Sequence, residues 1–188
     1  GGRAAGAKAA MGTGVAGRPS VDRGADKSQL NARRNPVAGA LQAIFERVRK
    51  YPKRVVFAEG EEEQVMRAAL IFVNQGLGRA ILVGREDRVR GKLAALGLGD
   101  GDGIEIQNAR LSEHNTHYVQ YLYKRLQRRG EMPRDCQRMV NGDRNVFAAC
   151  MVALGDADAM VTGLTRSAAV CLGDIGQAID PAPGGSAF

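Results

Sequence analysis

The stretch Arg54-Val55-Val56-Phe57-Ala58-Glu59-Gly60 sets the expected fold class. Its short, continuous apolar run is typical of a strand buried on both faces, and the glycine that follows suits a tight turn. Glutamates at 61–63 then open a helical pattern, where carboxylates meet the positive end of the helix dipole. The segment therefore predicts a strand that passes directly into a helix, which is the repeating unit of a parallel sheet.

The same strand–helix unit recurs along the chain. Three further apolar runs predict strands at 80–83, 104–106 and 159–162. Helical spacing of apolar residues predicts helices over 36–51, 61–75, 86–96, 114–129, 133–140 and 146–154, and a last one through 175–179. Because successive parallel strands are joined by right-handed βαβ crossovers, we predict an α/β fold with a parallel sheet between layers of helices.

Composition divides the chain into three parts. Residues 1–35 are rich in Gly, Ala and Arg and predict a tail or linker, with one short helical piece around 4–11. The ordered domain is expected over 36–183, and residues 184–188 are expected to be a disordered end. Since the first residue is Gly, we expect the chain to start inside a longer one.

The basic charge lies in the tail and the first helix. The formal net charge is +7, yet residues 1–60 hold 12 Lys or Arg against 4 Asp or Glu, whereas residues 61–188 hold 15 against 16. A body without net positive charge argues against specific nucleic-acid binding, although a basic interaction module over 1–54 stays open as an alternative. No apolar run reaches the ~18 residues of a membrane span. Three cysteines without metal-site spacing favour the reducing cytoplasm over a disulfide framework.

The most informative polar segment follows the last predicted strand. Thr162 and Gly163 end that strand, and Thr165, Arg166 and Ser167 follow at the expected start of a helix. Free N–H groups at such a helix start lie at the carboxyl edge of the sheet, where ligands of open α/β sheets bind. Arg166 supplies a bidentate partner for phosphate or carboxylate. The segment predicts an anion site; the alternative is that Thr165 or Ser167 caps the helix and Arg166 is solvated.

Other polar clusters have simpler interpretations. Glu63 and Arg67 have the i, i+4 spacing of a helix-surface pair. His114 and His117 lack a nearby third ligand and favour a surface pair over a metal site. The glycines at 97–103 precede a strand, so they indicate a connector and not a dinucleotide fingerprint.

Several segments together resemble the phosphate acetyl/butyryl transferase family. They are Lys53–Glu63 with Arg67, Ile81–Gly84, Arg128–Gly130 and above all Gly155-Asp-Ala-Asp-Ala-Met-Val-Thr-Gly163. More narrowly, the chain is similar to the transferase-like C-terminal domain fused to bacterial NADP-dependent malic enzymes, since residues 7–19 are similar to the end of a malic-enzyme catalytic part. The resemblance implies the N-terminal part of a two-lobed phosphate acetyltransferase-like fold.

The resemblance also implies ligands. Family members exchange an acyl group between coenzyme A and phosphate, so acetyl-CoA or an acyl phosphate is the expected ligand. By position, Arg125 matches a substrate-site arginine, and Gly163, Thr165 and Ser167 match the loop beside the acyl phosphate. With Thr162 and Arg166 these residues form the predicted acyl-CoA site, and we expect Arg125 and the loop to face one pocket. No cofactor is expected in this chain, because NADP and a divalent metal belong to the upstream malic-enzyme part.

Two departures from the family pattern argue against catalysis. Gly173 stands where active transferases carry an arginine, and a later Ser, Arg and Asp cluster of the family has no counterpart. Without those charges the developing oxyanion and leaving phosphate lose stabilisation. We therefore expect regulatory acetyl-CoA binding or assembly as part of a malic enzyme, with an active phosphate acyltransferase as the alternative. Half of a two-lobed sheet leaves apolar surface uncovered, so a homo-oligomer is expected.

Overall fold

A computed structural model describes residues 36–97 and 103–185 of the chain, which divides into two compact units, Gly1–Gln42 and Ala43–Phe188. Of the first unit, only the start of helix α2 (Pro36–Lys50) is described. The predicted tail over 1–35 and most of the predicted connector and chain end therefore lie outside the described residues. Everything that follows concerns the second unit.

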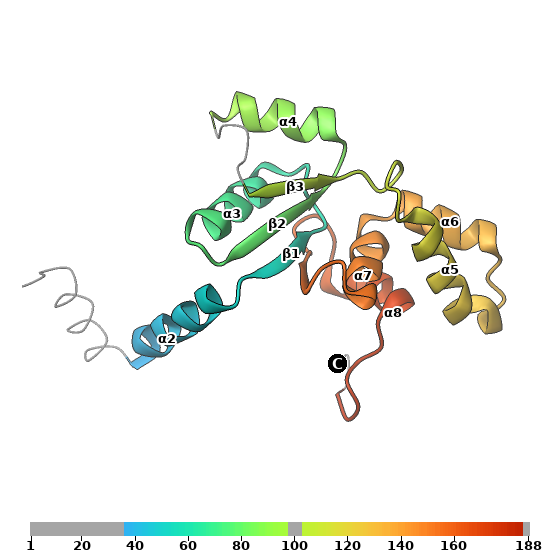
Figure 1. The fold of residues 1–188 in the computed structure, drawn as a ribbon. Coiled ribbons are helices and arrows are strands. Elements are labelled where there is room, and N and C mark those ends of the chain that lie inside the picture. The colour runs from blue at the N-terminus through green and yellow to red at the C-terminus, as the bar shows by residue number, and fades with distance from the viewer. Residues whose placement is uncertain (1–35, 98–102, 186–188) are drawn as a thin grey trace, which may run out of the picture. The chain divides into compact units, whose positions relative to one another are not determined.

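Four strands form one parallel sheet in the order β3-β2-β1-β4 across the described residues (Figure 1). They are β1 (Lys53–Phe57), β2 (Gly78–Val83), β3 (Ile104–Gln107) and β4 (Ala159–Val161). The register places Val56 of β1 opposite Ile81 of β2 on one side and Met160 of β4 on the other. The predicted α/β class with a parallel sheet is confirmed, and each strand lies within two residues of its predicted position.

The predicted helices are also present, with boundaries that follow from local chemistry. They are α3 (Glu63–Asn74), α4 (Glu86–Ala95), α5 (Asn115–Leu126) with a 3-10 turn η1 (Gln127–Arg129), α6 (Pro133–Gly142), α7 (Arg144–Leu154) and α8 (Ala168–Ala178). Pro133 begins α6, where its missing N–H costs nothing. Asp143 caps α7 by accepting hydrogen bonds from the N–H groups of Asn145 (2.8 Å) and Val146 (3.3 Å).

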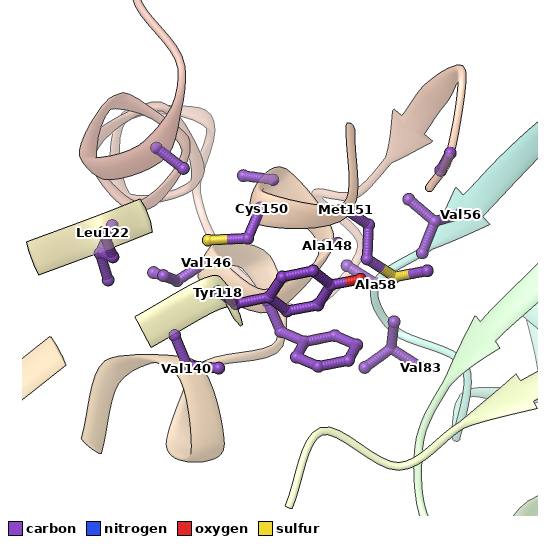
Figure 2. Packing of buried hydrophobic residues seen from close by; sticks show 14 of the residues in the cluster. Val56, Ala58, Val83, Tyr118, Leu122, Val140, Val146, Ala148, Cys150 and Met151 are labelled. Carbon is purple, nitrogen blue, oxygen red and sulfur yellow. The ribbon is translucent and has the colours of Figure 1, made fainter. Parts of the chain in front are cut away.

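Apolar side chains on the two faces of the sheet form two separate clusters. On one face, Phe57 and Leu82 pack with Met66 of α3 and Leu93 of α4. On the other face, the cluster joins the sheet to α5 through α8, and Figure 2 shows Tyr118 among Val56, Val83 and the small side chains of α7. The strands are apolar on both faces because helices cover both, as the continuous apolar runs predicted.

Buried polar groups and thiols complete this core. The Tyr118 hydroxyl donates to Asp156 Oδ2 at 2.7 Å, which satisfies the one polar atom of a fully buried ring. The three cysteines, Cys136, Cys150 and Cys171, are free and buried. None of the helices over 36–97 and 103–185 has both the length and the apolar character needed to span a bilayer.

Candidate functional site

The order in which strands are added to the sheet reverses at β1, on the side where β4 joins. From β1 the chain proceeds through α3 to β2 and then to β3, whereas β4 joins the opposite side of β1 only after α7. All four strands are parallel, so the segments after β1 and β4 emerge side by side at the same edge. Ligands of open α/β sheets bind in the crevice at such a switch point, so the residues after these two strands define the candidate site.

The carboxylate of Glu59, two residues after β1, lies in a cradle of donors formed by the loop after β4. Its Oε2 accepts hydrogen bonds from the backbone N–H groups of Gly163 (3.1 Å) and Leu164 (2.7 Å). Its Oε1 accepts from the backbone N–H (2.7 Å) and the hydroxyl (2.6 Å) of Thr165. Glu59 is only 2% exposed. The loop that the sequence predicted to bind an anion thus holds an anion of the chain itself; we call this arrangement the Glu59 cradle.

Two glycines make the Glu59 cradle possible. Gly163 has φ of +109°, a conformation that side chains disfavour, and it turns three successive N–H groups toward one point. Gly60 lies so close to β2 that a Cβ there would be 2.8 Å from the Leu82 Cβ and from the Val83 backbone. Its N–H donates to the Val83 carbonyl at 3.1 Å, which ties the turn after β1 to the sheet and fixes the backbone next to Glu59.

Electrostatics keep Glu59 ionised. Burial by itself raises the pKa of a carboxyl group, but hydrogen bonds from Thr165 and Leu164 and the charge of Arg144 outweigh it and hold the pKa of Glu59 below its ordinary value of 4.5. The Arg144 guanidinium lies 3.7 Å from Glu59 Oε1 and donates to the Thr165 hydroxyl at 2.6 Å. A charged carboxylate therefore occupies the loop donors at neutral pH.

Arg166, the cation predicted for the ligand, pairs with two carboxylates of the chain. Its Nη1 donates to Asp143 Oδ2 at 2.6 Å and to Asp174 Oδ2 at 2.7 Å. Asn145 links Asp174 to the end of β4, since its Nδ2 donates to Asp174 (2.9 Å) and its Oδ1 accepts from the Thr162 hydroxyl (2.7 Å). This network joins the end of β4 to the start of α7 and to α8. Both partners of Arg166 are therefore carboxylates of the protein itself.

The other predicted site residues have partners in the protein as well. Ser167 caps α8 by accepting from the Val170 N–H at 3.4 Å. Arg125 makes a two-pronged contact with Asp180, at 3.0 and 2.8 Å, and donates to the Gln177 carbonyl at 3.1 Å. These contacts lie at the C-terminal end of α8, whereas the Glu59 cradle precedes its N-terminal end, so the structure does not bring Arg125 to the loop. That any of these residues contacts a ligand stays a prediction.

Cavities of opposite charge flank the Glu59 cradle. Thr165 and Leu164 line a cavity of about 450 Å³ together with Glu62, Glu63 and Gln64 at the start of α3. We call it the loop cavity; its carboxylates disfavour a phosphate group there. A second cavity, of about 320 Å³, lies beside Arg144, and its other charged lining residues are Arg85, Arg110 and Glu61. Bound phosphate groups are therefore favoured on the Arg144 side of the edge.

Sequence reasoning missed Glu59 and Arg144 as members of the site. The available signal for Glu59 was its position directly after a buried strand, at the edge where parallel strands end. The prediction of a helix-surface pair is confirmed, because the Arg67 guanidinium lies 2.8 Å from the Glu63 carboxylate. The ring of His114 stacks on Tyr118 with centroids 5.8 Å apart. Within the described part of the chain no three His, Cys, Asp or Glu side chains are grouped to hold a metal ion.

Comparison with known proteins agrees with this fold. Residues 40–188 match the family described as Phosphate acetyl/butaryl transferase, and the chain belongs to that family. More particularly, it is 56% identical over 179 residues to an NADP-dependent malic enzyme of Rhizobium meliloti (strain 1021), covering 95% of this chain and 24% of that protein. The resemblance seen in the sequence, including the malic-enzyme form of the domain, is confirmed.

Two further relatives are phosphate acetyltransferases. A phosphate acetyltransferase of Nitratidesulfovibrio vulgaris is 32% identical over 141 residues, covering 75% of this chain and 20% of that protein. The crystal structure of a phosphotransacetylase from Streptococcus pyogenes superposes with a TM-score of 0.68 at 30% identity, covering 77% of this chain and 44% of that one. The chain therefore spans a quarter or less of these curated relatives and under half of the solved one.

Proposed function

We propose that this chain serves as the phosphate acetyltransferase-like part of an NADP-dependent malic enzyme and binds an acyl-CoA, with acetyl-CoA as the first candidate. In this proposal binding regulates the oxidative decarboxylation of malate, or the assembly of a homo-oligomer, and the acyl group is not transferred. NADP and a divalent metal are assigned to the rest of such an enzyme. Supporting the proposal, the 56% identical malic enzyme matches this chain over 24% of its own length.

The Glu59 cradle is the observation that carries the proposal of binding without transfer. Acyl transfer needs donors aimed at the oxygen on which negative charge develops, and losing one such donor slows catalysis by about 10²- to 10³-fold. Here three N–H groups and a hydroxyl at the switch point already bind a carboxylate. Arg166 is likewise paired with two carboxylates, and Gly173 brings no charge. Binding of the uncharged acyl end of the ligand beside the loop is still open, since the loop cavity lies next to Thr165 and its carboxylates disfavour only the phosphate groups.

Calorimetry tests the proposal directly. We expect acetyl-CoA to release heat on binding to this chain, and to change malate oxidation by a parent enzyme that contains it. Leu164→Ala trims a side chain that lines the loop cavity and is 48% exposed, so it should weaken binding without unfolding the protein. Ile71→Ala, at a 57% exposed position outside that cavity, is the matched control. Absence of heat, or equal weakening by both variants, would count against the proposal.

An active phosphate acyltransferase is the second candidate, favoured by the two phosphate acetyltransferase relatives. Incubation with acetyl phosphate and coenzyme A should then consume free thiol faster than a protein-free control, and the rate should fall in Arg125→Ala. Our proposal expects no protein-dependent rate. Sustained thiol consumption in the wild-type chain would replace our proposal with this second one.

A further inference from the structure

Two cavities lie next to each other outside the carboxyl ends of β2 and β3. The larger, of about 750 Å³, lies between Arg110, which follows β3, and one face of α6. The smaller is the cavity of about 320 Å³ beside Arg144. Arg110, Asn141 and Gly142 line both, so the two cavities are adjacent, and together we call them the α6 groove. Its volume is in the range of small-molecule sites, and it lies at the edge where ligands of such sheets bind.

The α6 groove carries unbalanced positive charge. Five arginines line it against two carboxylates, Glu61 and Asp135. Both carboxylates are already paired, Glu61 with Arg85 at 2.9 Å and Asp135 with Arg138 at 2.8 Å. Hydrogen bonds from Arg85 lower the pKa of Glu61 to about 2, so that pair is fully charged at neutral pH.

Two of the five arginines have no acceptor among the residues that the structure describes. Arg144 is engaged by Thr165 and Glu59, and Arg85 and Arg138 by the carboxylates just named. Arg110 and Arg134 are exposed, and no residue of the described ranges 36–97 and 103–185 accepts a hydrogen bond from either guanidinium or forms an ion pair with it. They come from two different parts of the fold, Arg110 from the segment after β3 and Arg134 from α6, and both line the larger cavity.

Two asparagines of the α6 groove are oriented as donors. The side-chain oxygen of Asn108 accepts the Arg110 N–H at 3.1 Å, and that of Asn141 accepts from Asn115 Nδ2 at 3.1 Å. Asn115 is itself fixed by a second bond to the Ala109 carbonyl at 2.8 Å. Since both carbonyl oxygens are used within the protein, the NH₂ groups of Asn108 and Asn141 are left to donate, and neither has an acceptor in the described part of the chain.

We propose that the α6 groove binds the phosphate or diphosphate group of a small molecule through Arg110, Arg134, Asn108 and Asn141. Two guanidinium groups and two amides offer only donors, and they suit a ligand with several anionic oxygens. A single carboxylate has too few oxygens for this set, and an apolar ligand would leave it unpaired. The proposal does not depend on the acyl-CoA assignment, because it concerns an anion and neither a thioester nor an acyl chain.

Inorganic pyrophosphate is the probe for the α6 groove. Titrated by calorimetry into the full 188-residue chain at low ionic strength, it should bind one site. Arg110→Ala and Arg134→Ala should each weaken binding roughly tenfold, the lower end for a hydrogen bond between charged groups at an exposed position. The matched control is Arg79→Ala at the opposite, amino end of β2, which removes an equal charge from another exposed side chain and should leave the affinity unchanged.

Side-chain amide signals give a second readout by NMR. Pyrophosphate should shift the NH₂ signals of Asn108 and Asn141 in the wild type, and not in the Arg110→Ala/Arg134→Ala double variant. Equal weakening by Arg79→Ala, unchanged affinity in both groove variants, or immobile amide signals would each overturn the proposal. Pyrophosphate binding in the groove without acetyl-CoA binding would refute only the proposed function; the reverse result would refute only the α6 groove.

Discussion

Replacing Glu59 with glutamine keeps the shape of the side chain but removes its charge and one of its acceptors. Each carboxylate oxygen accepts two hydrogen bonds, three of the four from backbone N–H groups and one from the Thr165 hydroxyl, which alone could turn to accept from a glutamine NH₂ group. Whichever way the glutamine turned, at least one buried N–H group would lose its acceptor, at about 1 to 3 kcal/mol. We therefore expect Glu59→Gln to lower the free energy of unfolding by about 1 to 3 kcal/mol.

Urea unfolding at neutral pH, followed by circular dichroism, measures this change. Glu63→Gln is the matched control, because Glu63 lies four residues away, its side chain is 54% exposed, and within the described ranges it pairs with Arg67 alone, at the surface. Its loss should cost about 0.5 kcal/mol or less. If the two variants differ from the wild type by the same small amount, the Glu59 cradle does not contribute the stability that we assign to it.

The pH dependence of the same measurement has a definite sign. A carboxyl group whose pKa is lowered by folding stabilises the folded state above its unfolded value, here 4.5, and loses that effect as the pH falls through the lower folded value. The difference in unfolding free energy between wild type and Glu59→Gln should therefore be full at pH 7 and shrink below pH 4.5. A difference that stays constant or grows on acidification would refute the ionised state of Glu59.

Further predictions concern the packing around the site. Gly60→Ala should destabilise the protein by about 1 to 3 kcal/mol, because a Cβ there would lie 2.8 Å from β2 atoms. Gly91→Ala should stabilise it by about 0.5 to 1 kcal/mol, because Gly91 lies within α4 and a Cβ there meets open space. Thermal unfolding of both variants checks this pair, and equal effects would contradict it. Tyr118→Phe should cost about 1 to 2 kcal/mol by removing the hydrogen bond to Asp156, with the exposed Tyr51→Phe near zero as the control in urea unfolding.

Local patterns were sufficient to predict the elements of the fold. An apolar run such as Ala80–Val83 is buried by helices on both faces, so its strand is visible without knowledge of its neighbours. Boundaries set by a single residue, such as Pro133 at the start of α6, are likewise local. The Glu63 and Arg67 pair was predictable for the same reason, since one helical turn separates the partners.

The site was harder because its partners are distant in sequence. Glu59 and Gly163 are 104 residues apart, and nothing near Glu59 indicates that a loop of N–H donors will bind its carboxylate. From the neighbouring residues alone, the glutamates after β1 predict only that this turn repels anions. For Arg125, the expectation that was not met is that it shares a pocket with the loop at Thr165. Its position on a face of α5 was predictable, but its distance from Thr165 depends on how α5 packs along α8.

The buried thiols have a practical consequence for the chemistry used to study this protein. Burial raises the pKa of Cys150 to about 12 and also raises the pKa of Cys136, so almost none of either is thiolate near neutral pH. Disulfide reagents that follow free coenzyme A will thus meet little competition from these two side chains while the protein is folded. The low reactivity of these two thiols in the folded protein also makes them reporters of unfolding, because a thiol reagent can modify them only after the core has opened.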